Sequence, residues 1–180
     1  MWLRPDSLRA SGSMALVDSR ANTSAGGGWM LTLRDDGAVQ ASFYGTGSTL
    51  VLKSDSDLLT SEGRYQHLVM SLDADGSGSG TATFFVNGRQ WGDPVGYTGA
   101  SGYVEPDDVP FRIGHQRTDG STGIQPFHGE ISGFALYAKA LDQGEVLERF
   151  QLGVPEPATG IMALFGAVFL LARWRKTRKV

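Results

Sequence analysis

The chain has 180 residues, 41% hydrophobic and 10% aromatic, which suffices for one globular domain with a core plus an appendage. Its 25 glycines show no three-residue period, so a collagen-like chain is excluded and a turn-rich β domain is favoured. Without cysteine, neither a disulfide framework nor a thiolate metal site can form. Residues 1–157 carry 11 basic and 19 acidic side chains, a net charge of −8, which argues against nucleic acid as a partner.

Short runs rich in β-forming residues recur along the first 140 residues. Glycine, serine, asparagine and aspartate separate them, and no helical pattern lies between them. This arrangement predicts an all-β fold, an antiparallel jelly-roll sandwich, over a parallel α/β sheet. The runs are Met14 to Asp18, Trp29 to Arg34, Val39 to Tyr44, Thr49 to Lys53, His67 to Asp73, Thr81 to Val86, Phe111 to Ile113 and Phe127 to Tyr137.

Two local motifs specify a turn and a helix. Asn87-Gly88 supplies the two positive-φ residues of a type I′ turn, so a tight hairpin is expected between Thr83 and Trp91. After Leu141, Asp142 can cap a short helix and Glu145 can complete a capping box. The helix should pack on the sandwich through Val146, Leu147 and Phe150.

Four motifs in order carry a resemblance over residues 1–152. They are Tyr65-Gln66-His67-Leu68-Val69, Phe84-Phe85-Val86-Asn87-Gly88, Phe111-Arg112-Ile113-Gly114 and Phe127-His128-Gly129-Glu130-Ile131, closed by Ala140-Leu141-Asp142 and Glu145. Together they resemble a laminin-G-like (concanavalin A-like) jelly-roll domain. The resemblance implies a binding module for carbohydrate or protein.

The start of the chain departs from this family. Trp2-Leu3-Arg4-Pro5-Asp6 resembles the end of the family's third or so strand, and the strand before it is absent. Residues 1–13 also contain arginines and no apolar segment of a secretory signal. We therefore expect Met1 to be an internal methionine, with a signal peptide and roughly 40 to 60 more residues before it in the natural protein.

The C-terminal residues 158–180 have the pattern of a membrane anchor. Residues 158–172 contain no charge, and a basic cluster follows them: Arg173, Arg175, Lys176, Arg178 and Lys179. As a helix, fifteen residues rise about 22 Å, short of the ~30 Å hydrocarbon core. Spanning therefore requires snorkelling of Arg173 and Arg175, local thinning of the bilayer, or inclusion of the flanking residues in the helix. We expect one transmembrane helix with its basic tail in the cytoplasm.

A proline-rich linker, residues 153–157, joins the two parts and contains Pro155-Glu156-Pro157. This tripeptide, the apolar run and the basic tail closely resemble the PEP-CTERM sorting signal of exported proteins in Gram-negative bacteria. The resemblance implies a partner exosortase in the inner membrane. It also implies passage of the domain through that membrane to the cell surface or extracellular matrix.

Candidate ligand-contacting residues lie in or beside the loop-rich stretch from Gly92 to Pro110. The aromatic faces of Trp91, Tyr97 and Tyr103 could stack on sugar rings. Calcium is an optional cofactor in this interpretation, since Asp107, Asp108 and Asp119 offer hard oxygen ligands if their loops converge.

Catalysis is not expected. Glycoside hydrolases of the same superfamily need two carboxylates on one strand, and the nearest pattern, Glu105 to Pro110, lacks the second glutamate and contains two prolines. We therefore predict a non-catalytic surface or matrix protein that binds a polysaccharide or another matrix protein. The alternatives are a polysaccharide hydrolase, which would show two carboxylates facing a groove, and a purely structural surface protein.

Overall fold

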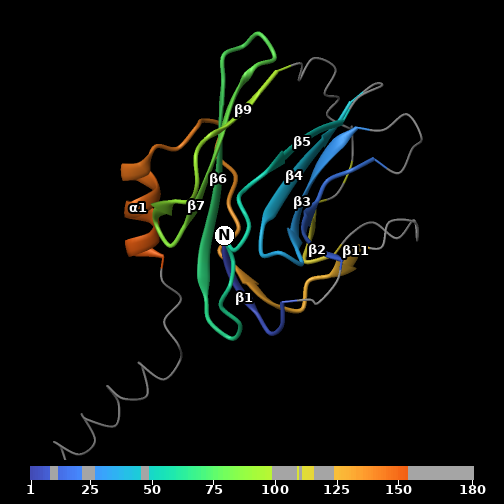
Figure 1. Ribbon diagram of the computed structural model, residues 1–180, viewed down its shortest axis with the longest axis vertical. Helices are drawn as coiled ribbons and strands as arrows, with labels where there is room; N and C mark the ends of the chain where they lie inside the picture. Colours follow the sequence, from blue (N-terminus) through green and yellow to red (C-terminus); the bar gives the residue numbers. More distant parts are fainter. Residues whose placement is uncertain are drawn as a thin grey trace, which may run out of the picture.

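The computed structural model describes residues 1–8, 12–21, 27–45, 49–98, 109, 111–115 and 124–153. These residues form two β-sheets that pack face to face, with one helix on the outside of the sandwich (Figure 1). The all-β sandwich predicted from the strand pattern is confirmed.

One sheet, which we call the β6 sheet, has the strand order β12-β1-β6-β7-β8, and β9 also pairs with β7. Every pair in it is antiparallel. Its strands are β1 (Trp2–Pro5), β6 (Gln66–Ala74), β7 (Gly80–Val86), β8 (Arg89–Gln90), β9 (Val95–Tyr97) and β12 (Gly129–Ser132).

The facing sheet, the β3 sheet, has the order β10-β2-β3-β4-β5. A short strand, β11, pairs with β2 in parallel. Two predicted runs, those of β4 and β5, coincide with the observed bounds. The strands are β2 (Ser13–Asp18), β3 (Gly28–Arg34), β4 (Val39–Tyr44), β5 (Thr49–Lys53), β10 (Arg112–Ile113) and β11 (Ile124–Pro126).

The core lies between the two sheets because alternate residues of each strand point inward. On the β3 sheet, Leu31 pairs with Ala41 and Leu33 with Val39, and all four are buried. Phe84 of β7 is the largest fully buried side chain. The loop residues Leu58 and Leu59 are also buried and belong to this core.

The helix α1 (Gln143–Leu152) begins as the sequence predicts. The Asp142 side chain accepts from the Glu145 N–H, and the Glu145 side chain accepts from the Asp142 N–H, which completes the capping box. Figure 1 shows α1 against the outer face of the β6 sheet, where Val146 is fully buried beside Phe85. Leu147, expected in the contact, is partly exposed.

The predicted β7–β8 hairpin is also confirmed. Asn87 and Gly88 have φ of 50° and 78°, as a type I′ turn requires. The hairpin is tied to neighbouring elements, because the Asn87 side chain accepts from the His67 N–H at 2.9 Å and Gln143 of α1 donates to the Gly88 carbonyl at 2.5 Å.

The predicted run Phe127 to Tyr137 is not one strand. Pairing with β1 begins at Gly129 and ends at Ser132. Gly133 then adopts a φ of 59°, which turns the chain out of the ladder. The residues after it do not extend β12. They line a groove between the two sheets, described below.

Several predictions fall on residues outside the described part. They include Pro155, Glu156 and Pro157, the apolar run and the basic cluster from Arg173 to Lys179. Among the described residues, no helix is both long and apolar enough to cross a membrane.

Candidate functional site

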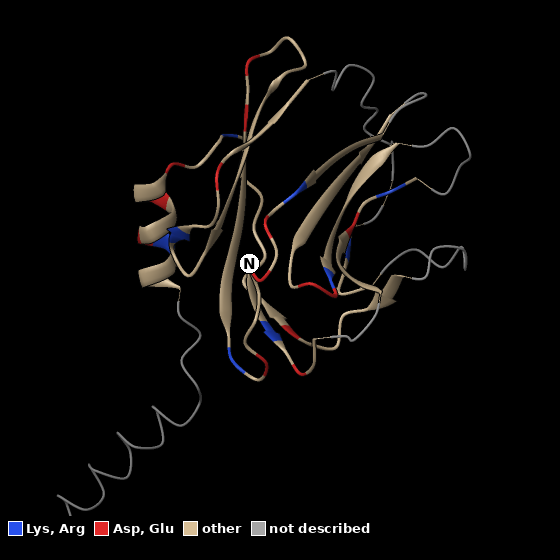
Figure 2. Ribbon diagram, in the orientation of Figure 1, with Lys and Arg blue, Asp and Glu red and all other residues tan. Residues whose placement is uncertain are grey.

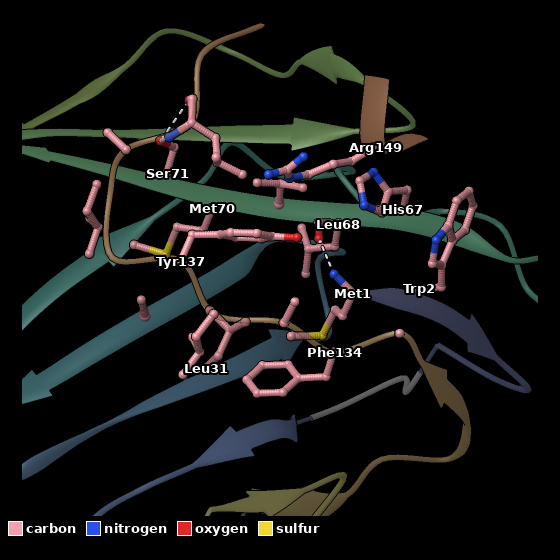
Figure 3. Close-up of a pocket in the computed structure, with 18 of the residues that line it drawn as sticks. Met1, Trp2, Leu31, His67, Leu68, Met70, Ser71, Phe134, Tyr137 and Arg149 are labelled. Atoms are coloured by element: carbon pink, nitrogen blue, oxygen red, sulfur yellow. Dashed lines mark hydrogen bonds between the residues drawn. The ribbon is translucent and has the colours of Figure 1, made fainter. Parts of the chain in front are cut away.

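The described residues line a groove of about 820 Å³ between the two sheets, which we call the inter-sheet groove. It lies where β1 begins, beside β6 (Figure 3). Its walls come from β6, from β3 and β4 opposite, and from the segment 133–141. The apolar wall residues include Met1, Trp29, Leu31, Phe43, Leu68, Met70, Phe111, Phe134, Leu136 and Tyr137.

The alternation of β6 divides its side chains between the groove and the helix. Leu68, Met70 and Leu72 pack against the core between the sheets, whereas Val69 packs in the small cluster beneath α1. Figure 3 shows Met70 beside Tyr137 on the groove side of β6. One face of β6 therefore forms a wall of the groove, and its other face forms the surface on which α1 packs.

The amino terminus is part of the groove wall. The Met1 ammonium donates to the Leu68 carbonyl at 3.0 Å, and the Leu68 N–H donates back to Met1 at 2.9 Å. Burial lowers the pKa of this ammonium to about 6, because the apolar surroundings disfavour its charged form.

An aromatic cluster closes one end of the groove. Trp2, His67 and Phe150 stack with ring centroids 4.9 to 6.1 Å apart. Burial, with a smaller effect of the nearby amino terminus, lowers the pKa of His67 to about 4. Its buried Nδ1 has no hydrogen-bond partner, so His67 is a neutral packing residue and not a charged contact.

The other wall is held by two contacts of the segment 133–141. The Ser71 hydroxyl donates to the Leu141 carbonyl and accepts from the Leu141 N–H, both at 2.9 Å. The Arg149 guanidinium lies 4.4 Å from the centre of the Tyr137 ring. Tyr137 is nevertheless 48% exposed and Leu136 is 59% exposed.

The described lining of the groove suits apolar contact. It contains no aspartate or glutamate, whereas glycoside hydrolases place two carboxylates beside the glycosidic bond. Nor do the described histidines, aspartates and glutamates form a cluster that could hold a metal ion.

The predicted ligand residues lie elsewhere. Trp91 follows β8 and Tyr97 ends β9, both at the far edge of the β6 sheet. Tyr97 packs on the core, and burial raises the pKa of its hydroxyl, helped by the charges of Asp75 and Asp73. The remaining predicted residues, Tyr103, Asp107, Asp108 and Asp119, lie outside the described part.

Trp91 differs from Tyr97 because its side chain is exposed to solvent and is also held in place by a hydrogen bond. Its side chain is 36% exposed, and its indole N–H donates to the Ser56 carbonyl at 3.3 Å. Its backbone N–H donates to the Phe84 carbonyl at 2.9 Å. Asp55 lies against Gly92 next to it, so a carboxylate accompanies the exposed ring.

Sequence reasoning missed two features. The first is the groove, which depends on strand pairing. The second is a buried ion pair on the β3 sheet, where Arg20 donates to both carboxylate oxygens of Asp18 at 2.8 and 3.0 Å and lies 5.6 Å from the Tyr44 ring. Among the described Asp, Glu, Lys and Arg, only this pair is buried, while the others lie on α1, on strands and in loops (Figure 2).

Comparison with known proteins agrees with this geometry. Residues 153–179 match the PEP-CTERM protein-sorting motif, which implies export and processing by an exosortase. Among solved structures, the Ruminococcus gnavus IT-sialidase CBM40 is similar at a TM-score of 0.59 and 14% identity, covering 82% of this chain and 78% of that one. A leech intramolecular trans-sialidase reaches 0.58 at 17% identity, covering 87% and 23%. These likenesses show the fold alone.

No curated protein matches the chain by sequence. A family match, however, covers most of it: residues 1–147 match the concanavalin A-like lectin/glucanases superfamily. Together with the two facing sheets, this match confirms the laminin-G-like resemblance. The chain therefore belongs to the concanavalin A-like lectin/glucanases superfamily.

Proposed function

We propose that this chain is a non-catalytic module of the cell surface or extracellular matrix that binds a polysaccharide or a matrix protein. The observation that carries the proposal is the order of two matches, a lectin-like sandwich followed within six residues by a sorting motif. In this proposal an exosortase processes the chain near Pro155-Glu156-Pro157, and the domain leaves the inner membrane.

The groove chemistry supports a binding role over hydrolysis. Its described lining offers no carboxylate to act as acid, base or nucleophile. The net charge of −8 over residues 1–157 further favours a neutral polysaccharide over an anionic one.

Trp91 is the proposed stacking residue for a sugar ring. Its indole is held at its N–H by the Ser56 carbonyl, so little side-chain freedom is lost when a ligand covers the exposed face. Tyr97 is not proposed as a direct contact because it packs on the core. Tyr103 and the calcium ligands Asp107, Asp108 and Asp119 remain proposals from the sequence.

The binding part is tested with polysaccharide from the producing strain's own matrix, by affinity electrophoresis. Trp91→Ala should weaken binding by about ten-fold, equivalent to about 1.4 kcal/mol, and Trp91→Phe should retain most of it. Val51→Ala on β5 is the matched control, since Val51 is exposed, apolar and not among the residues that line the inter-sheet groove. Unchanged binding by Trp91→Ala excludes this site, and absence of saturable binding favours the purely structural alternative.

The sorting part is tested by replacing Pro155, Glu156 and Pro157 with alanine in the producing bacterium. The variant should stay in the inner membrane, measured by fractionation, while Glu148→Ala on the exposed side of α1 should be sorted normally. Unchanged surface display or release of the triple variant would contradict this part.

A further inference from the structure

Three large apolar side chains are exposed near the point where the chain leaves the domain. Leu152, the last residue of α1, is 80% exposed, and Leu136 and Tyr137 in the segment before α1 are exposed as well. Single exposed leucines are ordinary on a protein surface, whereas exposed apolar side chains that gather on one surface are typical of interaction sites. We call Leu136, Tyr137 and Leu152 the exit patch, because the chain leaves α1 at Gly153 beside them.

Arg149 of α1 connects the two parts of the exit patch. Its guanidinium lies 4.4 Å from the centre of the Tyr137 ring. Residues three apart on a helix share a face, so Leu152 lies on the same side of α1 as Arg149. The Gly153 N–H donates to the Arg149 carbonyl at 3.0 Å, which holds the exit point against the same turn. Leu136, Tyr137, Leu152 and Gly153 also line the same groove, so the patch is one surface.

The charged side chains around the exit patch balance one another. Lys139, two residues after Tyr137, forms an ion pair with Glu145 in the first turn of α1. Arg149 lies over the Tyr137 ring, and its sequence neighbour Glu148 is exposed. Leucine and tyrosine side chains with arginine and lysine beside them are typical of surfaces at a membrane interface. The composition of the patch therefore favours a lipid headgroup layer over a strongly charged partner.

The length of the linker limits how far the exit patch can lie from a bilayer. The linker joins Gly153 to Ala158, the first residue of the uncharged run, and even a fully extended chain covers at most roughly 18 Å between them. The headgroup layer takes up at least about 5 Å of this distance on each side of the membrane. With Ala158 at the edge of the hydrocarbon core, the end of α1 therefore lies within roughly 13 Å of the lipid surface.

We propose that the exit patch lies on the lipid bilayer while residues 158–172 are inserted in it, with Leu136, Tyr137 and Leu152 in the headgroup layer. The contact orients the domain and keeps Pro155-Glu156-Pro157 close to the membrane surface, where a membrane-embedded exosortase acts. Three side chains bury far less apolar surface than an inserted helix, so the domain leaves the lipid once processing removes that helix. The inference rests on the membrane transit proposed above and adds the surface of the domain that meets the lipid.

The test uses a fluorescent reporter at one position of the full chain, which is possible because the sequence contains no cysteine. Ala138→Cys is labelled with bimane and reconstituted into phosphatidylethanolamine–phosphatidylglycerol vesicles that contain a doxyl-labelled lipid as quencher. Ala138 is exposed next to Tyr137, so the label leaves the exit patch intact. Val51→Cys is the matched control. Val51 is exposed on β5 and, since its neighbour Leu52 points into the core, it lies on the outer face of the β3 sheet, away from α1.

Lipid quenching should be about three-fold or more stronger at Ala138 than at Val51, because only the first position reaches the lipid. Adding Leu136→Ser and Leu152→Ser to the Ala138→Cys chain should lower the quenching to the level at Val51. Both leucines are exposed, so the melting temperature should stay unchanged, which verifies that the variant is folded. Equal quenching at the two positions, or quenching that survives the double substitution, overturns the proposal.

Extraction of the same vesicles with alkaline carbonate tests the membrane insertion separately. A chain that stays with the vesicles while Ala138 and Val51 are quenched equally overturns this inference and leaves the proposed transit in place. A chain that is extracted overturns both. The exosortase is the competing partner: if the environment of the Ala138 label changes only when exosortase is added to the vesicles, the exit patch binds that protein and the proposal is wrong.

Discussion

The sandwich has a closed half and an open half built from the same kinds of residue. In the closed half, around Phe84, Leu33 and Leu59, side chains are at most 1% exposed. In the open half, around Met1, Met70 and Tyr137, apolar residues surround a groove of about 820 Å³. The halves differ in strand pairing: beside the groove, β6 loses its β1 neighbour after Leu68. Apolar composition is thus insufficient for dense packing unless strands on both sides bring the side chains together.

The largest loss of stability should follow from a cavity-creating substitution in the closed half. Phe84→Ala removes a ring that is 1% exposed and leaves a cavity that its neighbours cannot fill. We expect the free energy of unfolding to fall by about 3 to 5 kcal/mol, measured by urea denaturation of the purified protein. A loss below about 1 kcal/mol would show that the two halves are equally loose.

The next effect concerns pH at the boundary between the halves. The pKa of His67 is lowered from 6.5 to about 4 by burial, so between these values the unfolded chain binds a proton that the folded chain does not. Stability should therefore fall as pH drops from 6.5 toward 4, by up to about 2 kcal/mol after screening by solvent is allowed for. His67→Gln should flatten the pH dependence in this window, and an unchanged slope would contradict the assignment.

A third effect tests the contact between the hairpin and α1. Gly88→Val should cost more than about 1 kcal/mol because φ is 78° and the new Cβ would lie 3.0 Å from the Phe150 side chain. Gly76→Val is the matched control, with a φ of 79° and no atom within 4 Å of its Cβ. Thermal unfolding of both variants separates backbone strain from the clash with α1. Equal melting temperatures would mean that α1 contributes nothing to the effect.

The smallest effect belongs to the open half. Tyr137→Ala removes a ring that is 48% exposed and whose main partner is the Arg149 guanidinium. We expect a loss of about 0.5 to 1 kcal/mol in urea denaturation, the size of an exposed cation–π contact. A loss as large as that of Phe84→Ala would remove the distinction between the halves.

Local motifs were predictable wherever neighbouring residues alone decide the backbone. The strands Val39–Tyr44 and Thr49–Lys53, the Asn87-Gly88 turn and the Asp142 cap all match the expectation. β9 (Val95–Tyr97) was missed because it is three residues long with a glycine at its centre, and it forms only by pairing with β7. The run Phe127 to Tyr137 failed because its second half lacks a paired neighbour.

The candidate site was less predictable than the fold. Trp91 and Tyr97 are six residues apart in sequence, yet one is exposed and anchored by Ser56 while the other packs on the core. Aromatic side chains serve equally well in a core and in a sugar site, so their type does not distinguish the two roles.

By itself, the sequence determined the alternating strands, the turn and cap residues and the bipartite charge distribution, because these depend on residues close together in the chain. Only the tertiary structure decided which strands become neighbours, and hence that β1 lies along β6 only as far as Leu68 while β7 pairs with β6 from Leu68 to Ala74. Strand pairing joins residues more than sixty positions apart, as Met1 and Leu68 show, and no local pattern encodes such a contact. The inter-sheet groove is the direct consequence of that pairing.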